Sequence, residues 1–156
     1  MSKVSKDLKK MPEAELIKDI RGFFKERKII VLCTASKEGI PRASSMDYYM
    51  EKSEDNYNIY VGLSPGIKIK NIEENPVVSI GIYTPLDTGK IQGMQISATG
   101  IERLILMREG DQGFDEAQEI VRGKRNILLK IIPEKIELLD YSYRKKGYST
   151  MQILDL

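Results

Sequence analysis

Apolar residues recur at helical spacing near the start of the chain. The members of this stripe are Leu16, Ile17, Ile20, Phe23 and Phe24. Such a stripe is typical of an amphipathic helix that packs one face against a core. Pro12 suits a first turn, glutamates follow it at the positive end of the helix dipole, and basic residues lie at the negative end. The pattern therefore predicts a helix over residues 12–27.

Most of the remaining chain consists of short β-rich runs separated by turn-forming residues. We expect strands at residues 29–35, 41–50, 57–63, 77–83, 91–106, 127–132 and 135–139, and a short extended tail at 148–154. One further helix is expected at residues 111–121. Many strands joined by short turns favour a closed or nearly closed barrel over a doubly wound sheet. The sequence thus predicts a mainly β fold, a β-barrel of about six strands with flanking helices.

The organisation of the chain is that of one domain over residues 1–156, because it shows no repeat, low-complexity tract or linker. Residues 1–11 are predicted to be a flexible start. A net charge of +2 is far from the basic excess of a dedicated nucleic-acid binder. No apolar run approaches the ~20 residues that span a bilayer, and no apolar stretch follows the lysine-rich start. We expect a cytoplasmic protein with no nucleic-acid partner and no membrane partner.

Histidine is absent from the 156 residues. Its absence excludes a Ser-His-Asp triad, a Cys-His pair and a histidine-ligated zinc site. Cys33, the single cysteine, excludes an internal disulfide framework and is expected to be a buried structural residue. Chemistry near neutral pH would therefore be carried by a bound cofactor.

The segment Gly66-Ile-Lys-Ile-Lys-Asn-Ile-Glu-Glu-Asn-Pro76 lies between two predicted strands. Its Pro-Gly opening, short amphipathic turn and Asn-Pro stop predict a strand–helix–strand unit. The start of a helix leaves backbone N–H groups without partners, and Lys68 follows one turn in. This combination suits a phosphate group.

Together with the upstream hairpin at residues 31–46, this order resembles the FMN-binding split-barrel family, whose namesake is pyridoxamine 5′-phosphate oxidase. The family pattern reads strand, acidic-glycine turn, Pro-Arg strand and a lysine-containing turn that ends in Asn-Pro. The resemblance covers residues 13–140. It implies a split β-barrel that forms a homodimer with FMN at the subunit interface. It also implies that segment 141–156 reaches the partner, and we expect the apolar face of residues 57–63 in the interface.

The resemblance assigns the phosphate end of the flavin to basic residues. In the family, a lysine eight residues before the proline of the Asn-Pro stop contacts the phosphate, and Lys68 holds this position. The namesake enzyme has Ser-Arg before this lysine, where this chain has Gly-Ile, so Ser64 or Lys70 is the candidate substitute. Arg42 heads the Pro-Arg strand, where the family places a basic residue over the phosphate or the ribityl chain.

The resemblance also assigns the ring end of the site. The backbone of Ser44, Ser45 and Met46 is expected to line the flavin ring. The Gln95 side chain is expected at the polar rim of the ring, with Gln92 as the alternative. Bulky residues at the C-terminal end, Tyr143 and Tyr148, are the candidates for covering the partner's flavin.

The function implied is that of an FMN-dependent oxidoreductase that passes electrons from a reduced nicotinamide to a small acceptor. The namesake activity is rejected, because Asp47 replaces a lysine of the namesake enzyme and no histidine follows Pro133. The alternatives are a flavin carrier without turnover, a deazaflavin-dependent reductase and, less favoured without histidine, a haem protein.

Overall fold

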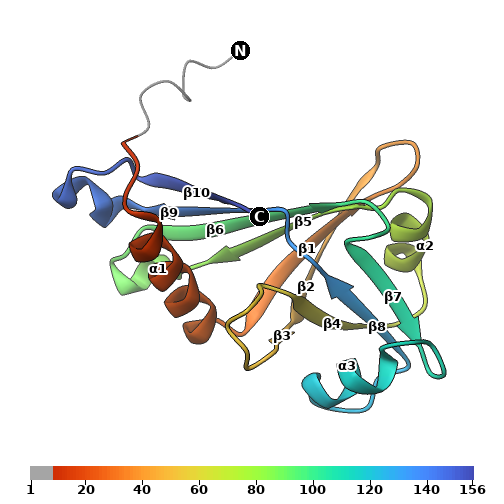
Figure 1. Ribbon diagram of the computed structural model, residues 1–156. Coiled ribbons are helices and arrows are strands. Elements are labelled where there is room, and N and C mark those ends of the chain that lie inside the picture. Colours follow the sequence, from red (N-terminus) through yellow and green to blue (C-terminus); the bar gives the residue numbers. More distant parts are fainter. Residues whose placement is uncertain (1–8) are drawn as a thin grey trace.

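The structure of the chain, a computed structural model, describes residues 9–156. The α-helices are α1 (Glu13–Glu26), α2 (Ile67–Glu74) and α3 (Phe114–Ile120), and the 3-10 turns are η2 (Leu86–Thr88) and η3 (Tyr141–Lys146). The strands are β1 (Ile29–Ala35), β2 (Pro41–Asp47), β3 (Tyr49–Met50), β4 (Ile59–Leu63), β5 (Val77–Tyr83), β6 (Gln92–Thr99), β7 (Leu104–Arg108), β8 (Ile127–Ile131), β9 (Lys135–Asp140) and β10 (Met151–Asp155). Figure 1 shows these elements along the described part of the chain.

The strands form two antiparallel sheets that enclose the main apolar core. The larger sheet has the order β10-β9-β6-β5-β1-β2, and the smaller has the order β3-β4-β8-β7. The core includes fully buried residues from both sheets, such as Ile30, Ile59 and Ile136. The predicted mainly β, barrel-like architecture is confirmed. No helix in the range 9–156 is long and apolar enough to cross a membrane.

The strand count is ten in residues 9–156 instead of about six, partly because two predicted strands are broken. The run at 91–106 turns at Gly100, whose φ is 103° and whose N–H donates to the Pro76 carbonyl at 2.8 Å. Strands β6 and β7 consequently belong to different sheets. The run at 41–50 breaks at Tyr48, which is buried and whose hydroxyl donates to the Phe24 and Arg27 carbonyls at 3.0 and 2.9 Å.

The expected interface at residues 57–63 is wrong. Strand β4 pairs with β3 and β8 inside the smaller sheet. Ile59 and Val61 have no exposed surface within the single chain, so their apolar face already belongs to the core.

The described start of the chain is held by the C-terminal segment. The Lys9 N–H donates to Ser149 Oγ at 2.8 Å, and the Met11 N–H donates to Gln152 Oε1 at 3.1 Å. The rest of the predicted flexible start, residues 1–8, lies outside the described residues.

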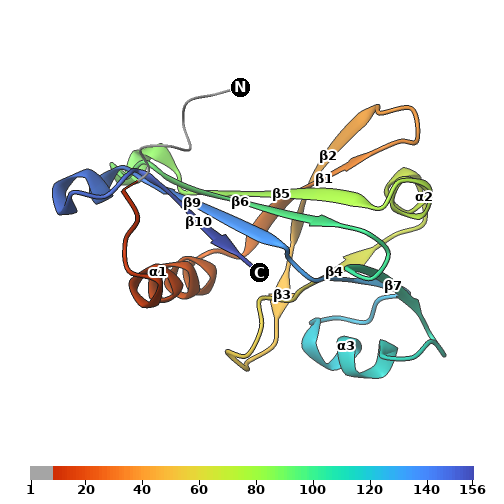
Figure 2. The same ribbon diagram turned by 45° about the horizontal axis from the view of Figure 1, so that its top comes forward.

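Within residues 9–156, the larger sheet is covered on one face only. Figure 2 shows α1, α3 and the smaller sheet on the same side of it. Strand alternation directs Ile30, Leu32 and Thr34 toward the covered side, where all three are buried. Residues of opposite alternation form the outer face, which includes Ala43, Ser45, Ser79, Gly81, Gln95 and Ser97. This outer face is broad and carries small side chains in its middle strands.

Candidate functional site

Strand β2 is an edge strand of the larger sheet, and residues 9–156 cover it only partly. None of its seven residues is buried, although its neighbour β1 has three buried residues. The register pairs Thr34 with Arg42 and Leu32 with Ser44, so Arg42, Ser44 and Met46 lie on the inward face. We call this partly covered face the β2 wall, since Met46 packs against the main core while Arg42 is exposed.

Helix α2 is fastened to the end of β1 next to this wall. Asn71 is buried, and its Nδ2 donates to Thr34 Oγ1 at 3.1 Å. Asn75 donates to the Ala35 and Ser36 carbonyls at 3.4 and 3.1 Å. Because Arg42 pairs with Thr34, these contacts bring α2 to the start of β2.

The first turn of α2 has the character of an anion site. It contains no acidic residue, and no side chain of residues 9–156 caps its start at Gly66. Lys68 lies in this turn and is half-buried, whereas Ser64 and Lys70 are exposed. Free N–H groups, a positive helix end and a lysine fit a phosphate dianion. Lys68 lies on α2, which is hydrogen-bonded to β1, and Arg42 lies on β2, which pairs with β1. The two predicted phosphate ligands therefore lie on elements that have β1 as a common neighbour.

The ring-end candidates lie on two faces of the sheet. Gln95 is exposed on the outer face, opposite Gly81 and Glu137, and Ser45 shares this face. Ser44 and Met46 lie on the inward face. Within one chain, the structure does not bring Gln95 together with the β2 wall.

The alternative glutamine, Gln92, belongs to an internal polar network. Its Oε1 accepts from Arg27 Nη2 and Thr84 Oγ1, both at 3.2 Å, and its Nε2 donates to Asp140 at 2.9 Å. Both ends of the amide are therefore engaged inside the chain. Of the two candidates, Gln95 is the one with an exposed side chain.

The C-terminal tyrosines pack against their own chain, so the expected flavin cover is wrong for Tyr143. Its side chain is 2% exposed, and its hydroxyl donates to Asp19 of α1 at 2.7 Å. The Tyr148 hydroxyl donates to Glu15 of the same helix at 3.3 Å. Burial is the main cause that raises the pKa of Tyr143. These two hydrogen bonds hold the C-terminal segment that contains Tyr143 and Tyr148 against α1.

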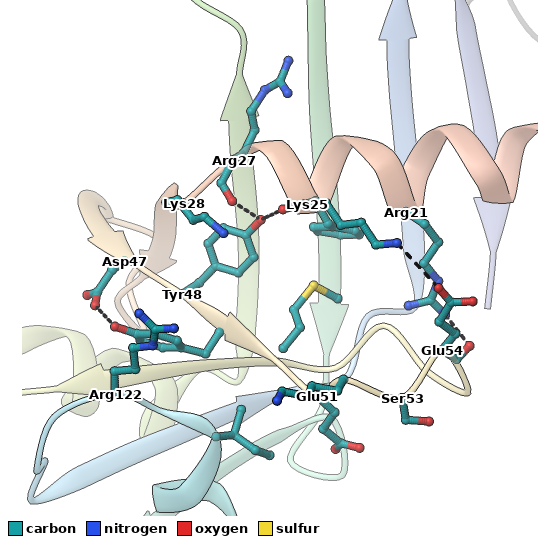
Figure 3. A pocket seen from close by; sticks show the side chains of 15 residues that line it. Arg21, Lys25, Arg27, Lys28, Asp47, Tyr48, Glu51, Ser53, Glu54 and Arg122 are labelled. Carbon is teal, nitrogen blue, oxygen red and sulfur yellow. Dashed lines mark hydrogen bonds and ion pairs between the residues drawn. The ribbon is translucent and has the colours of Figure 1, made fainter.

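A pocket of about 670 Å³ lies between α1, β3 and the end of α3. Figure 3 shows Lys28, Asp47, Tyr48 and Arg122 toward one end and Arg21, Lys25 and Glu54 toward the other. Its apolar wall includes Phe24, Met50 and Ile120. Sequence reasoning missed this pocket, because its residues come from three separate segments and no local motif marks them.

The tyrosines of the pocket are neutral at physiological pH. Burial raises the pKa of Tyr48 to about 12, against a smaller opposing effect of Arg27. The Tyr49 hydroxyl donates to Asp47 at 2.6 Å, and this hydrogen bond is the main cause that raises the pKa of Tyr49. No group of three His, Cys, Asp or Glu side chains in residues 9–156 is placed to hold a metal ion.

The chain matches the sequence profile of the family described as pyridoxamine 5′-phosphate oxidase over residues 16–138. It belongs to this family, and its two sheets form the split barrel that the resemblance implied. A comparison with proteins of curated function found no match in sequence.

Solved structures show the same fold. A pyridoxamine 5′-phosphate oxidase-related, FMN-binding protein from Nostoc punctiforme is 13% identical with a TM-score of 0.58, over 94% of this chain and 97% of that one. The General Stress Protein 26 from Bacillus anthracis is 17% identical with a TM-score of 0.60, over 91% and 99%. A heme binding protein from Mycobacterium smegmatis is 16% identical with a TM-score of 0.63, over 93% of this chain but 59% of that one. At such identities, the likeness concerns the fold.

Proposed function

We propose that the chain binds FMN and acts as a flavin-dependent oxidoreductase that passes electrons from a reduced nicotinamide to a small acceptor. The observation that carries the proposal is the partly covered inward face of β2, whose first residues pair with the end of β1 to which α2 is hydrogen-bonded. Family membership supports this assignment, and one structural relative is named as FMN binding.

The phosphate of FMN is assigned to α2 and β2. Lys68 and the free N–H groups of the first turn would bind phosphate oxygens, and Arg42 would add a second cation. Ser44 and Met46, on the same wall, would orient the ring. When bound, FMN supplies the electron-transfer chemistry, and these residues supply binding and orientation.

The ring end requires a second copy of the chain. Gln95 and Ser45 lie on the outer face, so one flavin can contact them and the β2 wall only if two subunits share the site. The outer face suits such an interface, because its middle strands carry Ser79, Gly81 and Ser97, which permit close approach. We therefore propose a homodimer with two shared sites, in the cytoplasm.

Phosphate recognition is tested by titrating the protein with FMN and with riboflavin. A charge-assisted hydrogen bond contributes about 1.5–3 kcal/mol, so Lys68→Ala should weaken FMN by about 10- to 150-fold. Riboflavin affinity should stay nearly unchanged. Lys124→Ala, an exposed lysine outside α2 and β2, is the matched control and should retain FMN affinity. Equal losses of both ligands in Lys68→Ala would show that Lys68 acts through the fold.

The absorption spectrum of the purified protein separates the remaining candidates. Flavin bands that reduced nicotinamide bleaches support the oxidoreductase. Flavin that only dithionite reduces would favour a carrier, and a deazaflavin band would favour a deazaflavin-dependent reductase. A Soret band would favour a haem protein, the kind of ligand named for the Mycobacterium smegmatis relative.

A further inference from the structure

A second pocket, of about 960 Å³, lies between α3 and the face of the smaller sheet that points away from the main core. Its lining comes from α3, from strands β3, β4, β7 and β8, and from the loop after β3. Within residues 9–156, none of the lining residues belongs to β2, to α2 or to the segment that follows α3. This sheet–helix pocket is therefore separate from the proposed flavin site.

The floor of the sheet–helix pocket is a row of side chains across the smaller sheet. The register pairs Tyr60 with Lys130 and Lys130 with Ile105, so these three side chains share the face that points away from the main core. The next row on this face contains Leu128 and Met107, which are buried in the cluster that α3 completes. Helix α3 has only seven residues, and Ile105 stays partly exposed beside it. The pocket is the part of this face that α3 leaves open.

The charged groups on the floor offset one another. The Tyr60 hydroxyl donates to Glu51 Oε1 at 2.6 Å, and this hydrogen bond is the main cause that lowers the pKa of Glu51. The Lys130 Nζ lies 5.9 Å from the centre of the Tyr60 ring, and its charge also lowers the pKa of Glu51. Glu51 is therefore ionised, and Lys130 offsets its charge.

The side of the pocket formed by α3 carries two carboxylates that the described part of the chain does not neutralise. Glu116 and Glu119 are three residues apart, so they lie on the same side of the helix. Both are exposed, and neither has an ion pair or a side-chain hydrogen bond within residues 9–156. Lys52 is the remaining cation among the described lining residues. The charge left over in the pocket is therefore negative and lies on α3.

We propose that the sheet–helix pocket binds an organic cation, an amine with an apolar body of ring size. The ammonium group would pair with Glu116 and Glu119, and the apolar body would lie against Ile105 and Ile120. The volume of the pocket is in the range of sites that hold small organic molecules. The proposal goes beyond the proposed function, because it assigns a ligand to a site that shares no residue with the flavin site.

The test is a titration of the ¹⁵N-labelled protein without flavin, followed by amide chemical shifts. The probes are benzylamine, which is a cation at pH 7, and benzyl alcohol, its neutral counterpart. Benzylamine should shift the signals of Ile105, Ala117 and Lys130. Each exposed ion pair contributes a factor of about 1.4 to 5 in affinity, so benzyl alcohol should bind about 2- to 30-fold more weakly.

The double variant Glu116→Gln with Glu119→Gln should lose about 2- to 30-fold in affinity for benzylamine and none for benzyl alcohol. The matched control is Glu38→Gln with Asp87→Asn, which removes two exposed carboxylates that do not line the pocket. This control should bind benzylamine as the wild type does. Equal affinities of the wild type for the two probes would overturn the proposal, as would a double variant that keeps its fold and its affinity for benzylamine. Benzylamine that shifts only signals outside the pocket would overturn it as well.

Discussion

Removing the Tyr48 hydroxyl should destabilise the fold by a predictable amount. This hydroxyl donates to the Phe24 and Arg27 carbonyls, which are at the C-terminal end of α1. Tyr48→Phe keeps the ring and its contact with Phe24, an edge-on pair with centroids 6.2 Å apart. The variant therefore removes the hydrogen bond between α1 and the break that separates β2 from β3.

The expected loss follows from the burial of the group. Tyr48 is 6% exposed and its hydrogen bond to the Phe24 carbonyl is buried, so this carbonyl would lose a donor in a place with little water. A buried polar group left without a partner costs about 1–3 kcal/mol. In a chain of this size, each kcal/mol shifts Tm by about 2–4 °C, so Tm should fall by roughly 2–12 °C.

The loss should depend on pH in a specific direction. The folded chain raises the pKa of Tyr48 to about 12, above the ordinary value of 10.0. Between these pH values, the unfolded chain releases the tyrosine proton while the folded chain keeps it, so rising pH favours unfolding. The stability advantage of wild type over Tyr48→Phe should be full below pH 10 and shrink toward pH 12.

Urea unfolding of both proteins at several pH values measures this difference directly. The variant's urea dependence should match that of the wild type, which shows that the same surface is exposed on unfolding. A difference in unfolding free energy that stays constant through pH 12, or is absent at pH 7, would refute this account of Tyr48.

Three further substitutions test other parts of the structure. Tyr143→Phe should lower the unfolding free energy by about 1–3 kcal/mol, because the hydrogen bond to Asp19 is lost. If the unfolding free energy stays unchanged while the rate of flavin reduction changes at constant flavin occupancy, Tyr143 would again be a candidate for covering the flavin. Gly100→Ala should cost about 1 kcal/mol or more in thermal unfolding, because its φ is positive, and an unchanged Tm would contradict this. Ser79→Arg, exposed on the outer face, should give monomers in sedimentation velocity while its unfolding free energy stays within about 0.5 kcal/mol. Glu109→Arg, exposed after β7, should stay dimeric, and dissociation of both variants would argue against the outer face.

Local patterns predicted the elements whose residues pack at regular spacing. Helix α1 and strands β1 and β5 fall where periodicity placed them, since alternate or every third to fourth side chain is buried. The two breaks escaped prediction because distant groups cause them. Tyr48 turns inward to carbonyls 21 and 24 residues earlier, and Gly100 donates to Pro76 across the hairpin.

The candidate site was predictable to a similar extent. Lys68 and Arg42 were proposed from short motifs. The buried hydrogen bond that attaches the helix of Lys68 to β1, the neighbour of the strand of Arg42, links Thr34 to Asn71, 37 residues apart. Gln95 and Ser44 lie on opposite faces of the larger sheet because of the register of its strands. Hydrophobic periodicity alone does not set this register. The pocket around Tyr48 could not be predicted either, because residues from three separate segments line it.

The central claim, a flavin site shared between two chains, is tested most directly by mixing two defective variants. One variant carries Arg42→Ala with Lys68→Ala on the inward side, and the other carries Gln95→Ala on the outer face. Each variant alone should bind FMN weakly. After subunit exchange in an equal mixture, half of the dimers are mixed, and each mixed dimer regains one intact site, so about a quarter of all sites should bind FMN tightly. A mixture that binds no better than the two variants measured separately would contradict the shared site.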